Sequence, residues 1–115
     1  PGDIPINRGL DNFKWALVNQ YPMTVTSHLI SDKIDLGRII LKSNVNVYKN
    51  DTVYDLSTRH FHNEFKLMIS SLKYLGRNHK LINVVHKGNY NSPLPHSIDE
   101  NIEYYFKTYK KKFSI

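Results

Sequence analysis

Residues 31–37 form a short polar segment that holds two carboxylates between two apolar segments. Asp32 and Asp35 are the acidic residues, and Gly37 gives the backbone freedom to turn into the segment that follows. A carboxylate held between buried strands meets an environment that can tune its pKa for proton transfer, so Asp35 is a candidate for acid–base chemistry. The alternative is that both aspartates are turn residues whose side chains bond to the nearby backbone.

The segments on either side of this loop predict two strands. Residues 24–30 precede the loop and residues 38–42 follow it, and both segments are β-branched or aliphatic and too short for helices. The second strand is expected to continue to residue 47, because apolar and polar residues alternate there. Residues 1–9 contain two prolines and two glycines and predict a loop. Loops that join buried strands commonly carry functional residues, so residues 31–37 are the first place to look for a site.

Apolar residues at helical spacing predict two helices in the first part of the chain. One runs over about residues 10–19 and ends before Pro22. A long one begins at an N-cap at Asn50 or Asp51, reaches residue 74 or 75 and stops at Gly76. Its apolar stripe predicts one face buried in the core: Val53, Leu56, His60, Phe61, Phe65, Met68, Ile69 and Leu72.

The last part of the chain predicts a short strand over residues 81–85, a turn-rich surface crossing over residues 88–95, and a terminal helix. Ser97 and Glu100 have the spacing of a capping box in front of that helix. Its buried face is expected to hold four apolar residues: Ile102, Phe106, Tyr109 and Phe113.

Length and composition restrict the protein class. The 115 residues suit one domain, and the absence of cysteine excludes disulfides and thiolate chemistry. There is no apolar run long enough to cross a bilayer and no secretory signal pattern, so a cytoplasmic location is the expectation. The net charge is +6, and residues 77–115 hold seven Lys and Arg against three Asp and Glu. A basic tail of this kind serves solubility or binds nucleic acid or a phosphate-bearing ligand.

Four pieces of the chain follow one another in an order that resembles the folate-dependent formyltransferase family. Asn7-Arg8-Gly9 is followed by a helix with Lys14-Trp15-Ala16-Leu17, then by Val25-Thr26-Ser27-His28, and then by the loop from Asp32 to Ile40. In the family, an arginine-glycine turn and a helix precede a V-T-x-H strand and a D-x-x-D-x-G-x-I-I loop. The resemblance covers residues 1 to about 75 and is nearest to the members that formylate amino sugars attached to nucleotides.

The resemblance implies an α/β fold and a chain that is part of a longer protein. Residues 1–76 are expected to form the C-terminal part of a Rossmann-like formyltransferase catalytic domain, and residues 77–115 a C-terminal extension with a short strand and a helix. In the family, a catalytic N-x-H triplet is followed by proline and a short turn that leads to the arginine-glycine pair, and Pro1-Gly2-Asp3-Ile4-Pro5 resembles that turn. The triplet is therefore expected just before Pro1.

The resemblance also implies roles for individual residues. Asp35 matches the catalytic aspartate, and His28 matches a strand histidine near the reacting centre, although a histidine bonded within the core is an equal alternative. Backbone groups of the loop are expected to line the pterin pocket, at Ser31, Asp32, Lys33 and Ile34. Arg8 either contacts a substrate phosphate or is a structural arginine that holds the turn.

The implied reaction is transfer of a formyl group from 10-formyltetrahydrofolate to a primary amine, without a metal. Attack by the amine makes a tetrahedral oxyanion that hydrogen-bond donors stabilise, and the aspartate supports a charged histidine and helps to move a proton. A nucleotide-linked amino sugar is the expected acceptor, and methionyl-tRNA or glycinamide ribonucleotide is the alternative. The rival from another class is a non-catalytic basic interaction module. Expected partners are the sugar, folate and a second copy of the chain, with no membrane and no nucleic acid, and the isolated 115 residues are expected to be inactive.

Overall fold

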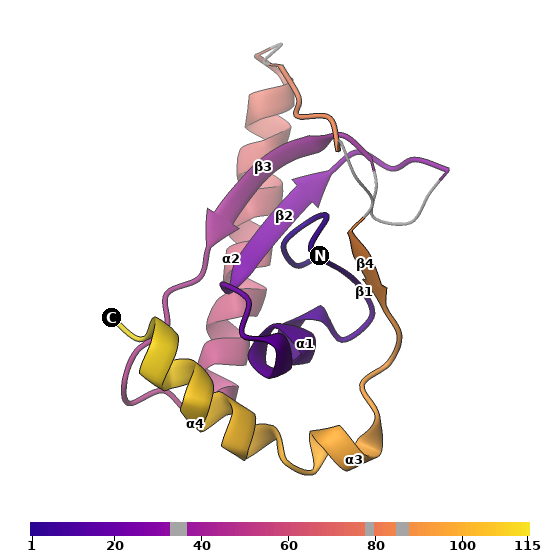
Figure 1. The fold of residues 1–115 in the computed structure, drawn as a ribbon. Helices are drawn as coiled ribbons and strands as arrows, with labels where there is room; N and C mark the ends of the chain where they lie inside the picture. Colours follow the sequence, from indigo (N-terminus) through magenta and orange to yellow (C-terminus); the bar gives the residue numbers. More distant parts are fainter. Residues whose placement is uncertain (33–36, 78–79, 85–87) are drawn as a thin grey trace.

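The computed structural model describes residues 1–32, 37–77, 80–84 and 88–115. These residues form a mixed α/β structure, as the sequence predicts, with two small sheets and helices around them (Figure 1). The elements in chain order are β1 (Asn7–Gly9), α1 (Asn12–Asn19), β2 (Thr24–His28), β3 (Ile39–Asn44), α2 (Val53–Leu75), β4 (Asn89–Asn91), α3 (His96–Asp99) and α4 (Ile102–Phe113).

The strands β2 and β3 form an antiparallel ribbon with a register shift near its end. Thr24 pairs with Asn44 and Ser27 with Leu41, but His28 pairs with Ile39, so Ile40 is an extra residue in β3. An extra residue of this kind is a β-bulge, which bends the strand and changes the direction of nearby side chains. The predicted strand over residues 24–30 is confirmed as far as His28. The one predicted over residues 38–42 is confirmed from Ile39 and extends only to Asn44.

A second, parallel sheet joins two segments that the sequence did not predict as strands. Asn7–Gly9 pairs with Asn89–Asn91, inside the regions predicted as a loop and as a surface crossing. Gly9 has φ +104°, and a Cβ atom there would lie 2.5 Å from Asn91 O, so glycine allows the two backbones to approach. Three-residue strands are too short to show a period in the sequence. In the described residues 81–84, the predicted strand is reduced to one bridge, in which Ile82 pairs with Ile39.

The long helix α2 begins later than predicted and ends where predicted. Its N-cap is Thr52 rather than Asn50 or Asp51. Thr52 N donates to Asp55 Oδ2 (2.8 Å) and Asp55 N donates to Thr52 Oγ1 (3.1 Å), which is a reciprocal capping box. Asp51 has another role, because its carboxylate accepts two hydrogen bonds from Arg59 at 2.7 and 2.8 Å. Gly76 is the C-cap, as expected.

Only part of the apolar stripe on α2 is in the core, which corrects the prediction. The face that packs on β2 and β3 contains Leu56, His60, Leu67 and Ser71. The other large side chains of the stripe are 44% to 67% exposed: Phe61, Phe65, Met68, Ile69 and Leu72. The helix therefore has two apolar faces. Among the described residues, only the face toward β2 and β3 is covered.

The hydrophobic core lies between α1, α4, the start of β2 and α2. The predicted face of α4 is confirmed, since Phe106 and Tyr109 are buried and Ile102 and Phe113 pack against them. Tyr109 donates its hydroxyl proton to Tyr21 O at 2.6 Å. The predicted capping box is wrong, because Ser97 lies inside the short helix α3 and makes no cap, and Asn101 precedes α4. The boundary predicted after residue 76 stays a prediction.

Figure 1 shows how these elements surround the N-terminal residues. The helix α2 lies along one face of the β2–β3 ribbon, α1 and α4 lie together at one end of it, and the N-terminus lies between β2 and β1. In the part of the chain that the structure describes, no helix combines the length and apolar character that a bilayer span requires.

Candidate active site

The predicted chemical loop is only partly within the described structure. Ser31 and Asp32 are described, and both are exposed at the start of the loop. Lys33, Ile34 and Asp35 lie outside the described residues, so their roles stay predictions. What the structure does describe is how the two ends of the loop are held, and which side chains lie beside them.

The backbone of Gly37 packs directly on the other end of the loop. A Cβ atom at Gly37 would lie 1.6 Å from Leu29 O and 3.3 Å from His28 Nδ1, so no larger residue fits. Leu29 N donates to Arg38 O at 2.9 Å next to this contact. The residues that begin and end this loop, Leu29 and Gly37, are therefore in contact with each other, and His28 lies beside that contact.

His28 is the last residue of β2, and its ring is fixed by a backbone group. The imidazole is half-buried, and its Nδ1 lies 2.8 Å from Leu29 O. A carbonyl oxygen only accepts hydrogen bonds, so Nδ1 carries the proton and donates it to Leu29 O. The structure thus places His28 beside the loop and outside the hydrophobic core cluster, and its catalytic role stays a prediction.

A cavity of about 300 Å³ lies between the end of β2 and α2. His28, Ser27 and Thr26 line it from β2, Glu64 lines it from α2, and Pro1, Leu67 and Met68 complete the wall. Sequence reasoning missed Glu64 as a lining residue. Its three- and four-residue spacing from Leu67 and Met68 places all three on one side of the helix, and this was the available signal.

The N-terminal residues are hydrogen-bonded along β2, at the edge of this cavity. Thr26 N donates to Pro1 O at 3.0 Å, and Ile4 N donates to the Thr26 hydroxyl at 3.4 Å. Thr26 is only 3% exposed. These bonds place Pro1 and His28 in the wall of the same cavity.

His60 lies one turn from Glu64 on α2, but it is a packing residue. The ring is buried, its centroid lies 5.5 Å from that of Phe13 in an edge-on contact, and Nδ1 is 3.8 Å from Glu64 Oε1. Burial lowers the pKa of His60, and the Glu64 carboxylate acts in the opposite direction. Over the described ranges, no group of three or more His, Asp or Glu side chains is arranged to hold a metal ion.

The structure does not bring Arg8 into the cavity with His28. Arg8 lies on β1 opposite Tyr90 of β4, and its guanidinium carbon lies 5.3 Å from the centre of the Tyr90 ring. Arg8 is half-buried and is not among the residues that line the cavity. A contact between Arg8 and a substrate phosphate stays a prediction.

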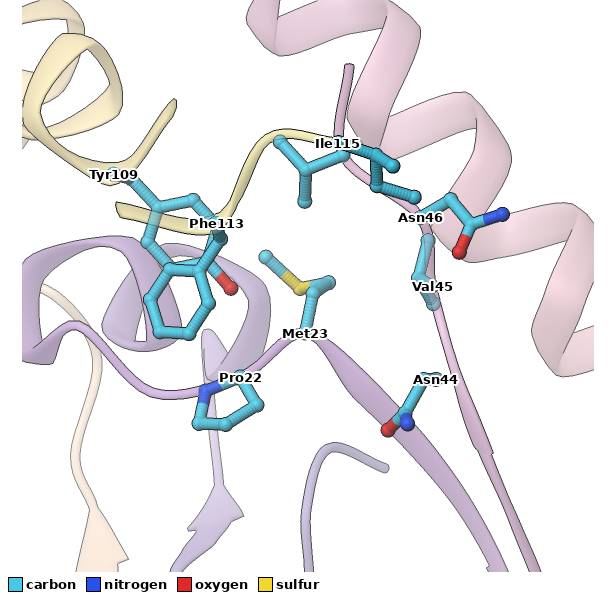
Figure 2. Close-up of a pocket in the computed structure, with 9 residues that line it drawn as sticks. Pro22, Met23, Asn44, Val45, Asn46, Tyr109, Phe113 and Ile115 are labelled. Atoms are coloured by element: carbon cyan, nitrogen blue, oxygen red, sulfur yellow. The ribbon is translucent and has the colours of Figure 1, made fainter. Parts of the chain in front are cut away.

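A second cavity of about 190 Å³ lies at the opposite end of the β2–β3 ribbon (Figure 2). It is lined by Pro22, Met23, Asn44, Val45, Asn46, Val47, Tyr109, Phe113 and Ile115. Among these described residues, no side chain carries a carboxylate, an imidazole or a charged amine. The one titratable side chain, Tyr109, donates to Tyr21 O, and burial raises its pKa. The cavity beside His28 is therefore the candidate active site.

No protein-family model matches the chain. Solved structures do match it. A 4-N formyltransferase from Francisella tularensis is 29% identical with a TM-score of 0.68, over 80% of this chain and 38% of that one. A sugar N-formyltransferase from Shewanella is also 29% identical, with a TM-score of 0.66, over 82% of this chain and 38% of that one.

A third structure covers more of the chain. The formyltransferase PseJ from Anoxybacillus kamchatkensis, solved with UDP-4,6-dideoxy-4-formamido-L-AltNAc and tetrahydrofolate, is 24% identical with a TM-score of 0.73. The match covers 97% of this chain and 61% of that one. The chain thus spans about two fifths to three fifths of the length of these proteins. Over that length it has the fold of the folate-dependent sugar formyltransferases, which confirms the resemblance predicted from the sequence.

Proposed function

We propose that this chain is part of an enzyme that transfers a formyl group from 10-formyltetrahydrofolate to the primary amine of a nucleotide-linked amino sugar. The observation that carries the proposal is the packing of Gly37 on Leu29 beside His28. It joins the two motifs on which the sequence resemblance depends, the V-T-x-H strand and the loop that follows it. The similarity to solved sugar N-formyltransferases supports the same activity.

In this proposal the loop supplies the catalytic aspartate and backbone contacts to the folate, and the cavity holds the reacting end of the folate. Asp35 belongs in sequence to the loop that connects Leu29 with Gly37, and the role assigned to its carboxylate is to support a charged histidine and to move a proton. Backbone groups of Ser31, Asp32, Lys33 and Ile34 contact the folate. The cavity beside His28 has the size of a small binding pocket and fits the reacting end of a folate rather than the whole molecule. When bound, 10-formyltetrahydrofolate supplies the formyl group.

The family resemblance implies two further catalytic groups, the asparagine and the histidine of an Asn-x-His triplet. An Asn-x-His triplet joined to Pro1 would enter the cavity that Pro1 and His28 line, because the hydrogen bond between Thr26 and Pro1 fixes the path of the chain there. Asparagine and protonated histidine would stabilise the oxyanion. A cytoplasmic location also stays a proposal.

The test uses the protein translated with the coding sequence upstream of Pro1. Purified protein is incubated with 10-formyltetrahydrofolate and a panel of amines: UDP- and dTDP-linked amino sugars, glycinamide ribonucleotide and methionyl-tRNA. The proposal expects formylation of a sugar nucleotide. Transfer to glycinamide ribonucleotide or methionyl-tRNA with none to any sugar would contradict the assigned acceptor, and no transfer to any amine would contradict the activity.

A basic interaction module is the second candidate, and the charges of α4 are the observation that favours it. The last turn of α4 contains Lys110, Lys111 and Lys112. Two of these lysines also bond to backbone carbonyls of the same chain, Lys110 to Asp51 O at 2.9 Å and Lys112 to Gln20 O at 3.4 Å. These bonds favour a structural role for the basic tail. Salt-dependent binding of RNA or DNA would support the module instead.

We further propose that two copies of the chain pair through the exposed stripe of α2. The exposed apolar residues of this helix, with Tyr54, offer roughly 700 Å² of surface, and a stable dimer buries about 800 Å² per partner. Asp55 in the first turn and Lys73 in the last turn lie about five helical turns apart, so they share one side of the stripe. Antiparallel pairing of two such helices places Asp55 beside the partner's Lys73, which is a self-complementary arrangement of charge.

A further inference from the structure

We propose that Ser71 is a positioning residue, which acts through Ser27 to fix the end of β2 that carries His28. The inference rests on the proposed function, since the use of His28 in the site gives this anchoring a purpose. Ser71 lies on α2 and is far from the loop in sequence. It does not belong to any motif on which the family resemblance depends.

The register shift lies next to the last residue of β2. The pairing changes between Ser27 and His28, where Ile40 is the extra residue of β3. Because the extra residue belongs to β3, β2 keeps its alternation, and Thr26 and His28 both line the cavity. The bulge interrupts the ladder of hydrogen bonds beside His28. Ser27 directly precedes His28, so a contact that fixes Ser27 also fixes the backbone from which the imidazole of His28 projects.

A chain of hydrogen bonds crosses the bulge and connects three elements. Leu41 N on β3 donates to Ser27 Oγ at 3.2 Å, and Ser27 Oγ is hydrogen-bonded to Ser71 Oγ on α2. Ser71 Oγ donates to Leu67 O at 2.7 Å. Because a hydroxyl has one proton, Ser27 must then donate to Ser71. Its other acceptor, Leu41 O, is farther away at 3.4 Å.

The burial of Ser71 indicates a role beyond packing. Ser71 is 4% exposed and lies on the face of α2 that packs on the sheet, where an apolar residue would avoid the cost of burying a hydroxyl. Bonds arranged in a chain strengthen one another, and removal of one member leaves its neighbour unsatisfied. Ser27 and Leu67, the two hydrogen-bond partners of Ser71, both line the cavity beside His28.

The test measures His28 directly in the 115-residue chain by NMR. Ser71→Ala removes the acceptor of Ser27, and Ser27→Ala removes the middle of the chain. Both changes should shift the imidazole resonances of His28, and should speed exchange of the Leu41 amide by about tenfold. The matched control is Ser70→Ala, on the adjacent exposed position of α2, which should change none of these.

Two substitutions of nearly equal shape at Ser71 distinguish the effect of the hydroxyl group from the effect of side-chain packing. Ser71→Thr keeps the hydroxyl and Ser71→Val lacks it, so the Thr variant should preserve the His28 resonances and the Val variant should not. Unchanged His28 signals in both Ser71→Ala and Ser27→Ala, or the same signals in the Thr and Val variants, would overturn the inference. No turnover is measured, so a failure of the proposed formyl transfer is a separate result.

Discussion

Gly37 and Leu29 are in such close backbone contact that a single added carbon would lie 1.6 Å from the Leu29 carbonyl oxygen. This contact closes the loop that holds Asp35 and places both of its ends beside His28. The geometry of the candidate site therefore depends on Gly37, because only a residue without a side chain allows the two backbone segments to approach so closely.

Gly37→Ala should destabilise the protein by about 3 kcal/mol, because the added Cβ must displace buried backbone. The matched control is Gly76→Ala, since the nearest atom to a Cβ there is 3.5 Å away and the backbone is helical. That substitution should be neutral or slightly stabilising. Urea unfolding of both variants measures the difference. Equal free energies of unfolding for the two variants would show that the Gly37 contact does not hold the loop.

Asp51→Asn should lower the free energy of unfolding by about 2 kcal/mol at neutral pH, because Arg59 loses the carboxylate that accepts its two hydrogen bonds. These hydrogen bonds lower the pKa of Asp51 from 3.8. A lowered carboxyl pKa gives stability that is complete above 3.8 and is lost as the pH falls through the folded-state pKa. The free energy of unfolding of the natural chain, measured against pH, should therefore fall in strong acid, and Asp51→Asn should lack this fall. Glu103→Gln, at an exposed position of α4, is the control.

His60→Leu should make stability less sensitive to mild acid. Burial lowers the pKa of His60 below 6.5, so the unfolded chain takes up a proton that the folded chain does not. The stability of the natural chain should then fall by about 1 kcal/mol as the pH drops from 7.5 to 5.5. The variant should lose this slope, and His62→Gln, on the exposed side of α2, should keep it. Urea unfolding at both pH values measures this, and an unchanged slope in His60→Leu would exclude His60 as its source.

Phe65→Asp should convert a dimer into a monomer. Phe65 lies in the middle of the exposed stripe of α2 and is 57% exposed, so the substitution has little cost within one copy. Sedimentation of the natural chain at increasing concentration should show a dimer, and the control Ser70→Asp, at an exposed position outside the stripe, should keep it. A natural chain that stays monomeric would contradict pairing through α2. So would a variant that remains dimeric.

The sequence predicted the elements whose patterns are local. The apolar spacing of α4 gave the buried positions of Phe106 and Tyr109, and Gly76 correctly marked the end of α2. The spacing on α2 also showed which residues are apolar, but it could not show how many of them have a partner. Phe61 and Phe65 were therefore placed in the core although they are exposed.

The site was predicted less completely, because its geometry depends on contacts between distant segments. The motif order pointed to His28 and Gly37, which the structure brings together. The pairing of Gly9 with Asn91, and the bond between Ser27 and Ser71, connect residues that no local pattern relates. Glu64 lines the cavity because α2 packs on β2. The helical period shows which residues share a face of α2, but it does not show which other element that face packs against.

The most direct test of the proposed enzyme is the effect of Asp35→Asn on formyl transfer. In the protein that includes the upstream coding sequence, transfer from 10-formyltetrahydrofolate to a nucleotide-linked amino sugar should be measured for the natural chain, Asp35→Asn and Asp32→Asn. Loss of a group that moves a proton should slow turnover by about 10²–10⁴-fold in Asp35→Asn. Binding of the sugar nucleotide should persist in that variant, and Asp32→Asn should keep most of the activity. An Asp35→Asn enzyme as fast as the natural one would contradict the account.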